Sequence, residues 1–141
     1  MDDVRIKLSA LWVCRMLAGF LGDVLGFMEP GALEQFNTGE VGGMILSSEL
    51  LFVAAVIMFL PILMVFLSLT MKYKAARWAN VILALGLFVF DLVGLPTYKG
   101  VHRQFLIAAG MGFNALTIWY AWRWKGTADM AAAAKPTRSA L

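Results

Sequence analysis

Four long apolar stretches dominate this chain, and short polar connections separate them. They run over residues 8–28, 44–70, 78–95 and 105–124. A helix needs about 20 mainly apolar residues to cross the hydrocarbon core of a bilayer. The pattern therefore predicts an all-α fold, a four-helix transmembrane bundle. It places a membrane domain at residues 1–125 and a disordered cytoplasmic tail at 126–141.

Composition supports the membrane interpretation. Hydrophobic residues make up 61% of the 141 positions and charged residues only 15%. So few charges would not cover the surface of a soluble domain of this size. The four spans and their connections use most of the chain, which leaves no room for a separate soluble catalytic domain.

The distribution of basic residues predicts the orientation. One side of the predicted bundle carries nine of them: Arg5, Lys7, Lys72, Lys74, Arg77, Arg123, Lys125, Lys135 and Arg138. The opposite side has only Lys99 and Arg103. The positive-inside rule then places both termini in the cytoplasm, with the chain in the plasma membrane. The same side holds the tryptophans, which are predicted to form one interfacial belt: Trp12, Trp78, Trp119, Trp122 and Trp124.

Charged residues inside the spans are the candidate functional residues, because a charge in a membrane is costly and often marks function. They are Arg15 and Asp23 in the first span, Glu49 in the second and Asp91 in the third. Glu49 also fits a solvated position at the start of its helix.

Helical spacing places several of these residues on common faces. In the first span, Arg15, Gly19, Gly22, Asp23 and Gly26 share one side. Gly22 and Gly26 form a small-xxx-small pair, which allows a second helix to approach closely. This face is therefore predicted either to pack against another helix or to line a polar cavity. In the third span, Asn80 and Asp91 lie on one side, and in the fourth Arg103, Gly110, Asn114 and Thr117 do the same.

Two polar tiers follow from a rise of about 1.5 Å per helical residue. Arg15 and Asn114 are predicted to lie in an inner tier. Asp23 and Asp91 are predicted to form an outer tier, with Glu49, His102 and Arg103 above them.

The outer tier has two interpretations. One is a structural cluster of salt bridges and hydrogen bonds that specifies which helices meet. The other is a proton or cation site formed by two neighbouring carboxylates. His102 is predicted to be an interfacial residue rather than a ligand.

Motifs for catalysis, metals and cofactors are missing from the sequence. There is no nucleophile–base pair, phosphate-binding loop or zinc-type ligand spacing, and we predict no enzyme activity, no metal and no cofactor. The single cysteine, Cys14, excludes an internal disulfide. No basic stripe on a folded surface supports nucleic-acid binding.

Several short stretches carry a family resemblance. They are residues 4–12, Asp23 with 28–31, 38–43, 77–80 and 118–122. Together they resemble an uncharacterised family of small prokaryotic four-helix membrane proteins, loosely similar to DoxX-like proteins. The resemblance implies a four-helix membrane fold and no established activity or ligand.

The sequence therefore predicts a small integral membrane protein of unknown activity. We expect a structural or accessory bundle in the lipid bilayer that self-associates or joins a larger complex. One alternative is a proton- or cation-coupled transporter, or an ion-conducting oligomer, that uses Asp23 and Asp91. The other alternative is an accessory subunit of a membrane redox complex.

Overall fold

The computed structural model describes residues 3–41, 44–97 and 100–125, and these are almost entirely helical. The elements are α1 (Asp3–Phe27), α2 (Ala32–Asn37), β1 (Glu40–Val41), β2 (Met44–Ile45), α3 (Ser48–Thr70), α4 (Tyr73–Gly94), the 3-10 helix η1 (Leu95–Thr97) and α5 (Val101–Arg123). In the described part, α1, α3, α4 with η1, and α5 are long and apolar enough to cross a membrane. The prediction of a helical protein with four such helices is confirmed. The predicted tail at 126–141 lies outside the described residues.

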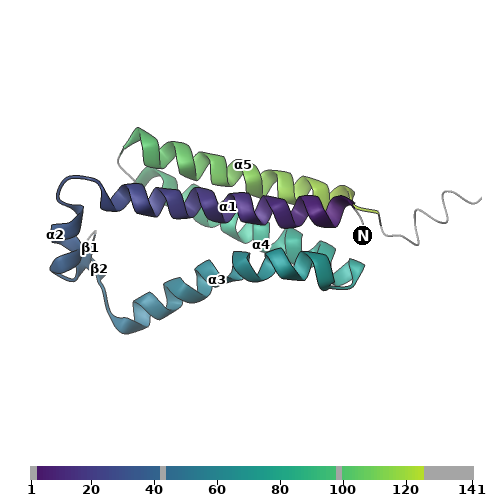
Figure 1. Cartoon of the computed structure of the whole chain (residues 1–141), viewed down its shortest axis with the longest axis horizontal. Coiled ribbons are helices and arrows are strands. Elements are labelled where there is room, and N and C mark those ends of the chain that lie inside the picture. The colour runs from purple at the N-terminus through teal and green to yellow at the C-terminus, as the bar shows by residue number, and fades with distance from the viewer. Residues whose placement is uncertain (1–2, 42–43, 98–99, 126–141) are drawn as a thin grey trace, which may run out of the picture.

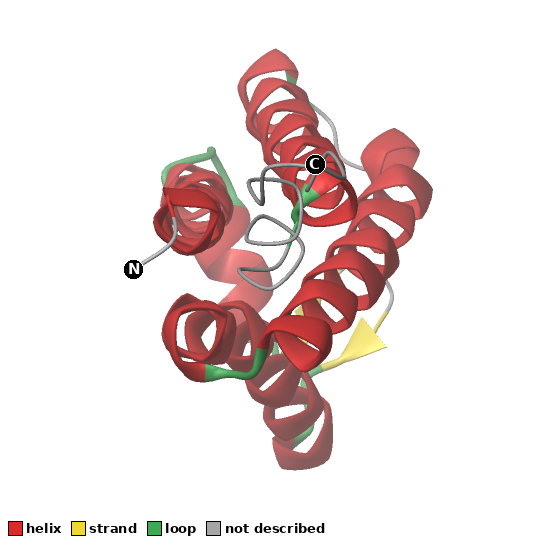
Figure 2. Ribbon diagram, turned by 90° about the vertical axis from the view of Figure 1, so that its right-hand side faces the viewer, coloured by secondary structure: helices red, strands yellow, loops and turns green. Residues whose placement is uncertain are grey.

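The long helices run along one another and enclose a shared interior (Figures 1 and 2). The main packing partners are α1 with α5, α4 with α5, and α1 with α3. One end of the bundle, where α1 and α4 begin and α3 and α5 end, is here called the basic end, after Arg5, Lys7, Lys72, Lys74, Arg77, Arg123 and Lys125. The other is called the loop end, since α2 and the β1–β2 hairpin lie beside it (Figure 1).

Helix boundaries differ from the predicted spans mainly at the polar ends. α1 begins at Asp3 rather than residue 8, and α4 begins at Tyr73 rather than residue 78. Charged first turns remain helical because helix formation needs backbone hydrogen bonds and not apolar side chains. The predicted span at 44–70 begins too early. Met44 and Ile45 pair as a strand with Val41 and Glu40, and Ser47 caps α3 by accepting a hydrogen bond from the Leu50 amide at 3.2 Å.

The first half of α3 diverges from α1 (Figure 1). Residues 51–56 are all exposed, whereas Pro61, Met64 and Ser68 in the second half are buried. Pro61 has no backbone N–H and so removes one helical hydrogen bond, which weakens the helix near the point of divergence. The bundle is therefore closely packed toward the basic end and opens toward the loop end.

Candidate functional site

A hydrogen-bonded polar core occupies the basic-end half of the interior. The Asn80 Oδ1 accepts from the Trp12 indole at 2.7 Å and from the Ser68 hydroxyl at 3.1 Å, while its amide nitrogen donates to the Ala76 carbonyl at 2.7 Å. Trp12, Ser68 and Asn80 are each 0% exposed. One asparagine thus joins α1, α3 and α4.

Two further contacts join α1 to α3 beside this core. The Ser9 hydroxyl donates to the Val65 carbonyl at 2.9 Å. The Arg5 guanidinium donates to the carbonyls of Ser68 and Met71 at 3.1 and 2.8 Å. Carbonyls at a helix C-terminus lack helical partners, so Arg5 satisfies groups that would otherwise need water.

The assignment of Trp12 to the interfacial belt is wrong. Its side chain is an interior residue with a hydrogen-bonded indole, and Trp124 is also buried, at 3% exposure. Trp78, Trp119 and Trp122 are exposed, as an interfacial belt requires. Spacing from the nearest charged residue gave the depth of Trp12, but it did not show which way the ring points.

An ion pair connects α1 to α4. One terminal nitrogen of the Arg15 guanidinium lies 2.7 and 2.9 Å from the two carboxylate oxygens of Asp91. Both side chains are largely buried, at 15% and 11% exposure. This contact overturns the prediction that Arg15 and Asp91 occupy separate tiers. Backbone rise placed them several residues apart, but the long arginine side chain extends well beyond its own turn.

Glycines make room for the guanidinium groups. A Cβ on Gly19 would lie 3.1 Å from a terminal nitrogen of Arg15, and one on Gly110 would lie 3.3 Å from the Arg15 Cδ. A Cβ on Gly26 would lie 3.1 Å from a terminal nitrogen of Arg103. Because a Cβ at any of these positions would crowd an arginine, these glycines make room for the side chains of Arg15 and Arg103.

Gly22 behaves more like the predicted packing residue. A Cβ there would be in ordinary contact, at 3.9 Å, with the Leu106 side chain of α5. The glycine face of α1 therefore packs against α5 at Gly22 and borders the guanidinium groups of Arg15 and Arg103, while a polar cavity along it stays a prediction.

Asn114 is fully buried one turn from Gly110, which contacts Arg15. Neither polar atom of its amide has a hydrogen-bond partner among the described residues, and the same holds for the Arg15 Nε. Buried polar groups are usually paired, so unpaired ones need a specific explanation. Together they give the interior an amide and a guanidinium N–H that are not used in holding helices together.

The two acids of the predicted outer tier have different surroundings. The Asp91 oxygens are bound by Arg15, whereas Asp23 is exposed and lies within electrostatic reach of Arg103 and Arg15. The two carboxylates are therefore not equivalent. Glu49 is exposed in the first turn of α3, a helix-start position.

Glu29 is the functional-site candidate that the sequence did not identify. Its carboxylate lies 2.9 Å from the His102 Nε2 and 3.7 Å from the Arg103 guanidinium, so it joins the end of α1 to the start of α5. Its position before Pro30 suggested only a turn. The basic pair His102–Arg103 at the start of the facing helix was the available signal, since it needs an acid opposite it.

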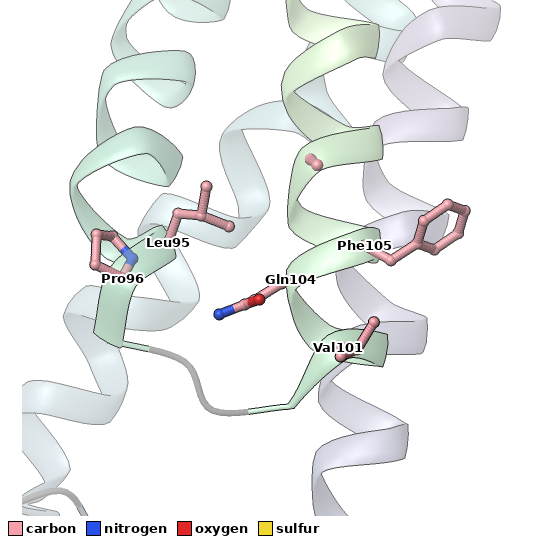
Figure 3. A pocket seen from close by; sticks show the side chains of 6 residues that line it. Leu95, Pro96, Val101, Gln104 and Phe105 are labelled. Atoms are coloured by element: carbon pink, nitrogen blue, oxygen red, sulfur yellow. The ribbon is translucent and has the colours of Figure 1, made fainter.

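Two surface pockets lie away from these interior charges. One, of about 510 Å³, is lined by Leu95, Pro96, Val101, Gln104, Phe105 and Ala108 at the loop end. Figure 3 shows Gln104 extending from α5 toward Leu95 and Pro96. The second pocket, also of about 510 Å³, lies at the basic end and is lined by Tyr73, Arg77, Trp122, Arg123, Trp124 and Lys125. In the described part of the chain, no group of three or more His, Cys, Asp or Glu side chains is arranged to hold a metal ion.

A family model decides the classification of the chain. The model, described as a family of unknown function (DUF6326), matches residues 1–129. This chain belongs to the DUF6326 family. The match covers all four long helices. No curated protein and no solved structure matches the chain. The similarity to DoxX-like proteins stays a prediction.

Proposed function

We propose that this DUF6326 protein is a non-catalytic structural or accessory bundle of the plasma membrane, with both termini in the cytoplasm. In this proposal it self-associates or joins a larger membrane complex. Its interior polar residues hold the helices in a fixed arrangement.

The Arg15–Asp91 ion pair is the observation that carries the proposal. A carboxylate bound at both oxygens by one guanidinium is engaged in a contact between helices and is not open to a solute. The Trp12–Asn80–Ser68 hydrogen bonds have the same character, since each joins two helices. Such groups need not raise stability above that of apolar packing, but they specify which helices meet.

The divergence of α3 supports association with another membrane helix. Residues 51–56 are exposed around the whole circumference of α3, although α3 is the most apolar of the four spans. A second copy or a partner subunit would give this segment the neighbours that the described part of its own chain does not supply.

To test this proposal, the full-length protein is extracted into native nanodiscs, the mass of the extracted complex is measured, and the co-purifying proteins are identified. We expect a complex larger than one chain. The single variants Arg15→Leu and Asp91→Leu should each lower the amount of this complex. The double variant should restore it, because it leaves no unpaired charge. A monomer without partners in the wild type would overturn the proposal.

The exposed Asp23 favours a second candidate function, a proton- or cation-coupled pathway. Its carboxylate lies within a membrane span, near the charges of Arg103 and Arg15, and it is accessible. Carboxylates in such positions are typical of ion-translocating proteins.

Flux measurements in liposomes separate this candidate from the first. Transport through Asp23 predicts that proton or cation flux falls in Asp23→Asn and Asp91→Asn. The flux should be unchanged in the control Glu49→Gln, which neutralises an exposed acid at the start of α3. Equal flux in the wild type and both aspartate variants would remove these carboxylates from the mechanism.

A further inference from the structure

The basic-end pocket has a composition that a membrane-spanning surface does not require. Three of its six lining residues are cationic, Arg77, Arg123 and Lys125, and none is acidic. The other three are aromatic, Tyr73, Trp122 and Trp124. A cavity that combines three positive charges with aromatic walls at the end of a membrane bundle is suited to an anion that also has an apolar part.

Local hydrogen bonds remove the acceptors that would compete with an anion there. The last carbonyls of α5 are negative ends of its dipole, but the Trp122 carbonyl accepts from Arg77 at 2.7 Å. The Trp124 carbonyl accepts from the Tyr73 hydroxyl at 2.5 Å. With these carbonyls already hydrogen-bonded, the pocket keeps an excess of donors.

One lining residue, Trp124, carries a donor that no described group uses. Trp124 is 3% exposed, and its indole N–H has no acceptor among the described residues. A buried N–H without an acceptor is unfavourable, so the side of the bundle that holds the pocket has one more donor than its own acceptors satisfy.

The start of α4 adds to the positive potential. Tyr73, its first residue, lines the pocket, and the N-cap residue Lys72 makes no side-chain capping hydrogen bond to this 22-residue helix. The first backbone N–H groups of a helix have no helical acceptor, and the helix dipole there favours negative charge.

The depth of the pocket indicates the source of the anion. Trp122 and Trp78 pack edge-to-face, with ring centroids 6.3 Å apart, and both are more than half exposed. Exposed tryptophans settle at the headgroup level of a bilayer, so the pocket opens where lipid phosphates lie. We propose that the basic-end pocket binds the phosphate headgroup of an anionic phospholipid.

The experiment is lipid titration of the delipidated full-length protein, followed by native mass spectrometry. Phosphatidylglycerol is compared with phosphatidylcholine, which has a phosphate but no net charge. The wild type should retain phosphatidylglycerol in preference. Arg123→Gln with Lys125→Gln should reduce that binding by about tenfold or more, since each basic group near a membrane surface contributes substantially to anionic-lipid binding.

A control variant loses the same number of positive charges at the same end of the bundle, but outside the pocket. Lys72→Gln with Lys74→Gln removes two positive charges beside the start of α4, but neither lysine lines the pocket. This control should keep the preference. Equal losses in both double variants, or no loss in either, would overturn the pocket as the site.

Inorganic phosphate distinguishes a lipid from a free anion. An excess of phosphate should compete only weakly, because it has no apolar part to contact Trp122. Complete displacement by phosphate, together with equal binding of the two lipids, would assign the pocket to a soluble anion and overturn the lipid proposal. Arg77 is left unchanged in these variants because its hydrogen bond to the Trp122 carbonyl supports the fold.

Discussion

The two halves of the bundle differ in how they are held together. Toward the basic end, Trp12, Ser68 and Asn80 are fully buried and hydrogen-bonded across three helices. Toward the loop end, α3 diverges and residues 51–56 are exposed. The most apolar span is the least buried of the four. Hydropathy therefore reports which segments tolerate lipid, whereas small and polar residues determine which segments pack against each other.

The Arg15–Asp91 ion pair joins α1 to α4, and breaking it should have the largest effect. Removing one partner leaves an uncompensated buried charge. Arg15→Leu or Asp91→Leu is therefore expected to lower the free energy of unfolding by about 3 to 5 kcal/mol. Denaturant-induced unfolding in detergent micelles, followed by circular dichroism, measures this change.

The double variant R15L/D91L supplies the control. It should recover most of the lost stability because neither charge remains. A double variant as unstable as the sum of the two single variants would mean that the residues act independently.

Two methionines on α3 compare the halves directly. Met64 is 4% exposed and Met58 is 53% exposed. Met64→Ala leaves a cavity inside the bundle and should cost about 2 kcal/mol, whereas Met58→Ala should cost much less. Similar losses of unfolding free energy for the two variants in the same assay would show that the first half of α3 is packed and does not diverge from the other helices.

Two buried asparagines separate paired from unpaired polar groups. Asn80→Leu leaves the Trp12 indole without its acceptor and should cost about 1 to 3 kcal/mol. Asn114→Leu removes an amide that has no partner among the described residues, so the free energy of unfolding of this variant should be unchanged or higher. A larger loss for Asn114→Leu than for Asn80→Leu would reverse this ranking.

Two glycines on α5 give the smallest and most local comparison. Gly110→Ala places a Cβ 3.3 Å from the Arg15 Cδ, and Arg15 is held by Asp91, so a loss of about 1 kcal/mol is expected. A Cβ on Gly112 meets nothing within 4 Å. Gly112→Ala should therefore raise stability by about 0.5 kcal/mol through helix propensity. Thermal unfolding of the two variants side by side tests the opposite signs.

Much of the fold followed from the sequence because hydropathy and helical periodicity are local properties. The four spans, the shared face of Arg15, Gly19 and Gly26, and the inward direction of Asn80 and Asn114 all depend on spacing within one helix. The start of α3 was misplaced because an apolar strand residue such as Ile45 resembles a helical one in a hydropathy profile.

The candidate site was less predictable because it depends on side-chain reach between helices. Counting backbone rise separated Arg15 from Asp91, yet the two are in direct contact. Asp23 and Asp91 were placed at one depth, but only Asp91 is bound by Arg15. Glu29 was missed since its partners, His102 and Arg103, are 73 or more residues away in the chain.

The distance along the chain between Arg15 and Asp91 has a consequence for biogenesis. Arg15 lies in α1, which is synthesised before α4, and its carboxylate partner Asp91 follows 76 residues later. At typical rates of translation, Asp91 is made roughly 4 to 15 s after Arg15. During this interval α1 holds a guanidinium that an isolated membrane helix tolerates poorly. We therefore expect stable insertion of α1 to depend on the later synthesis of α4.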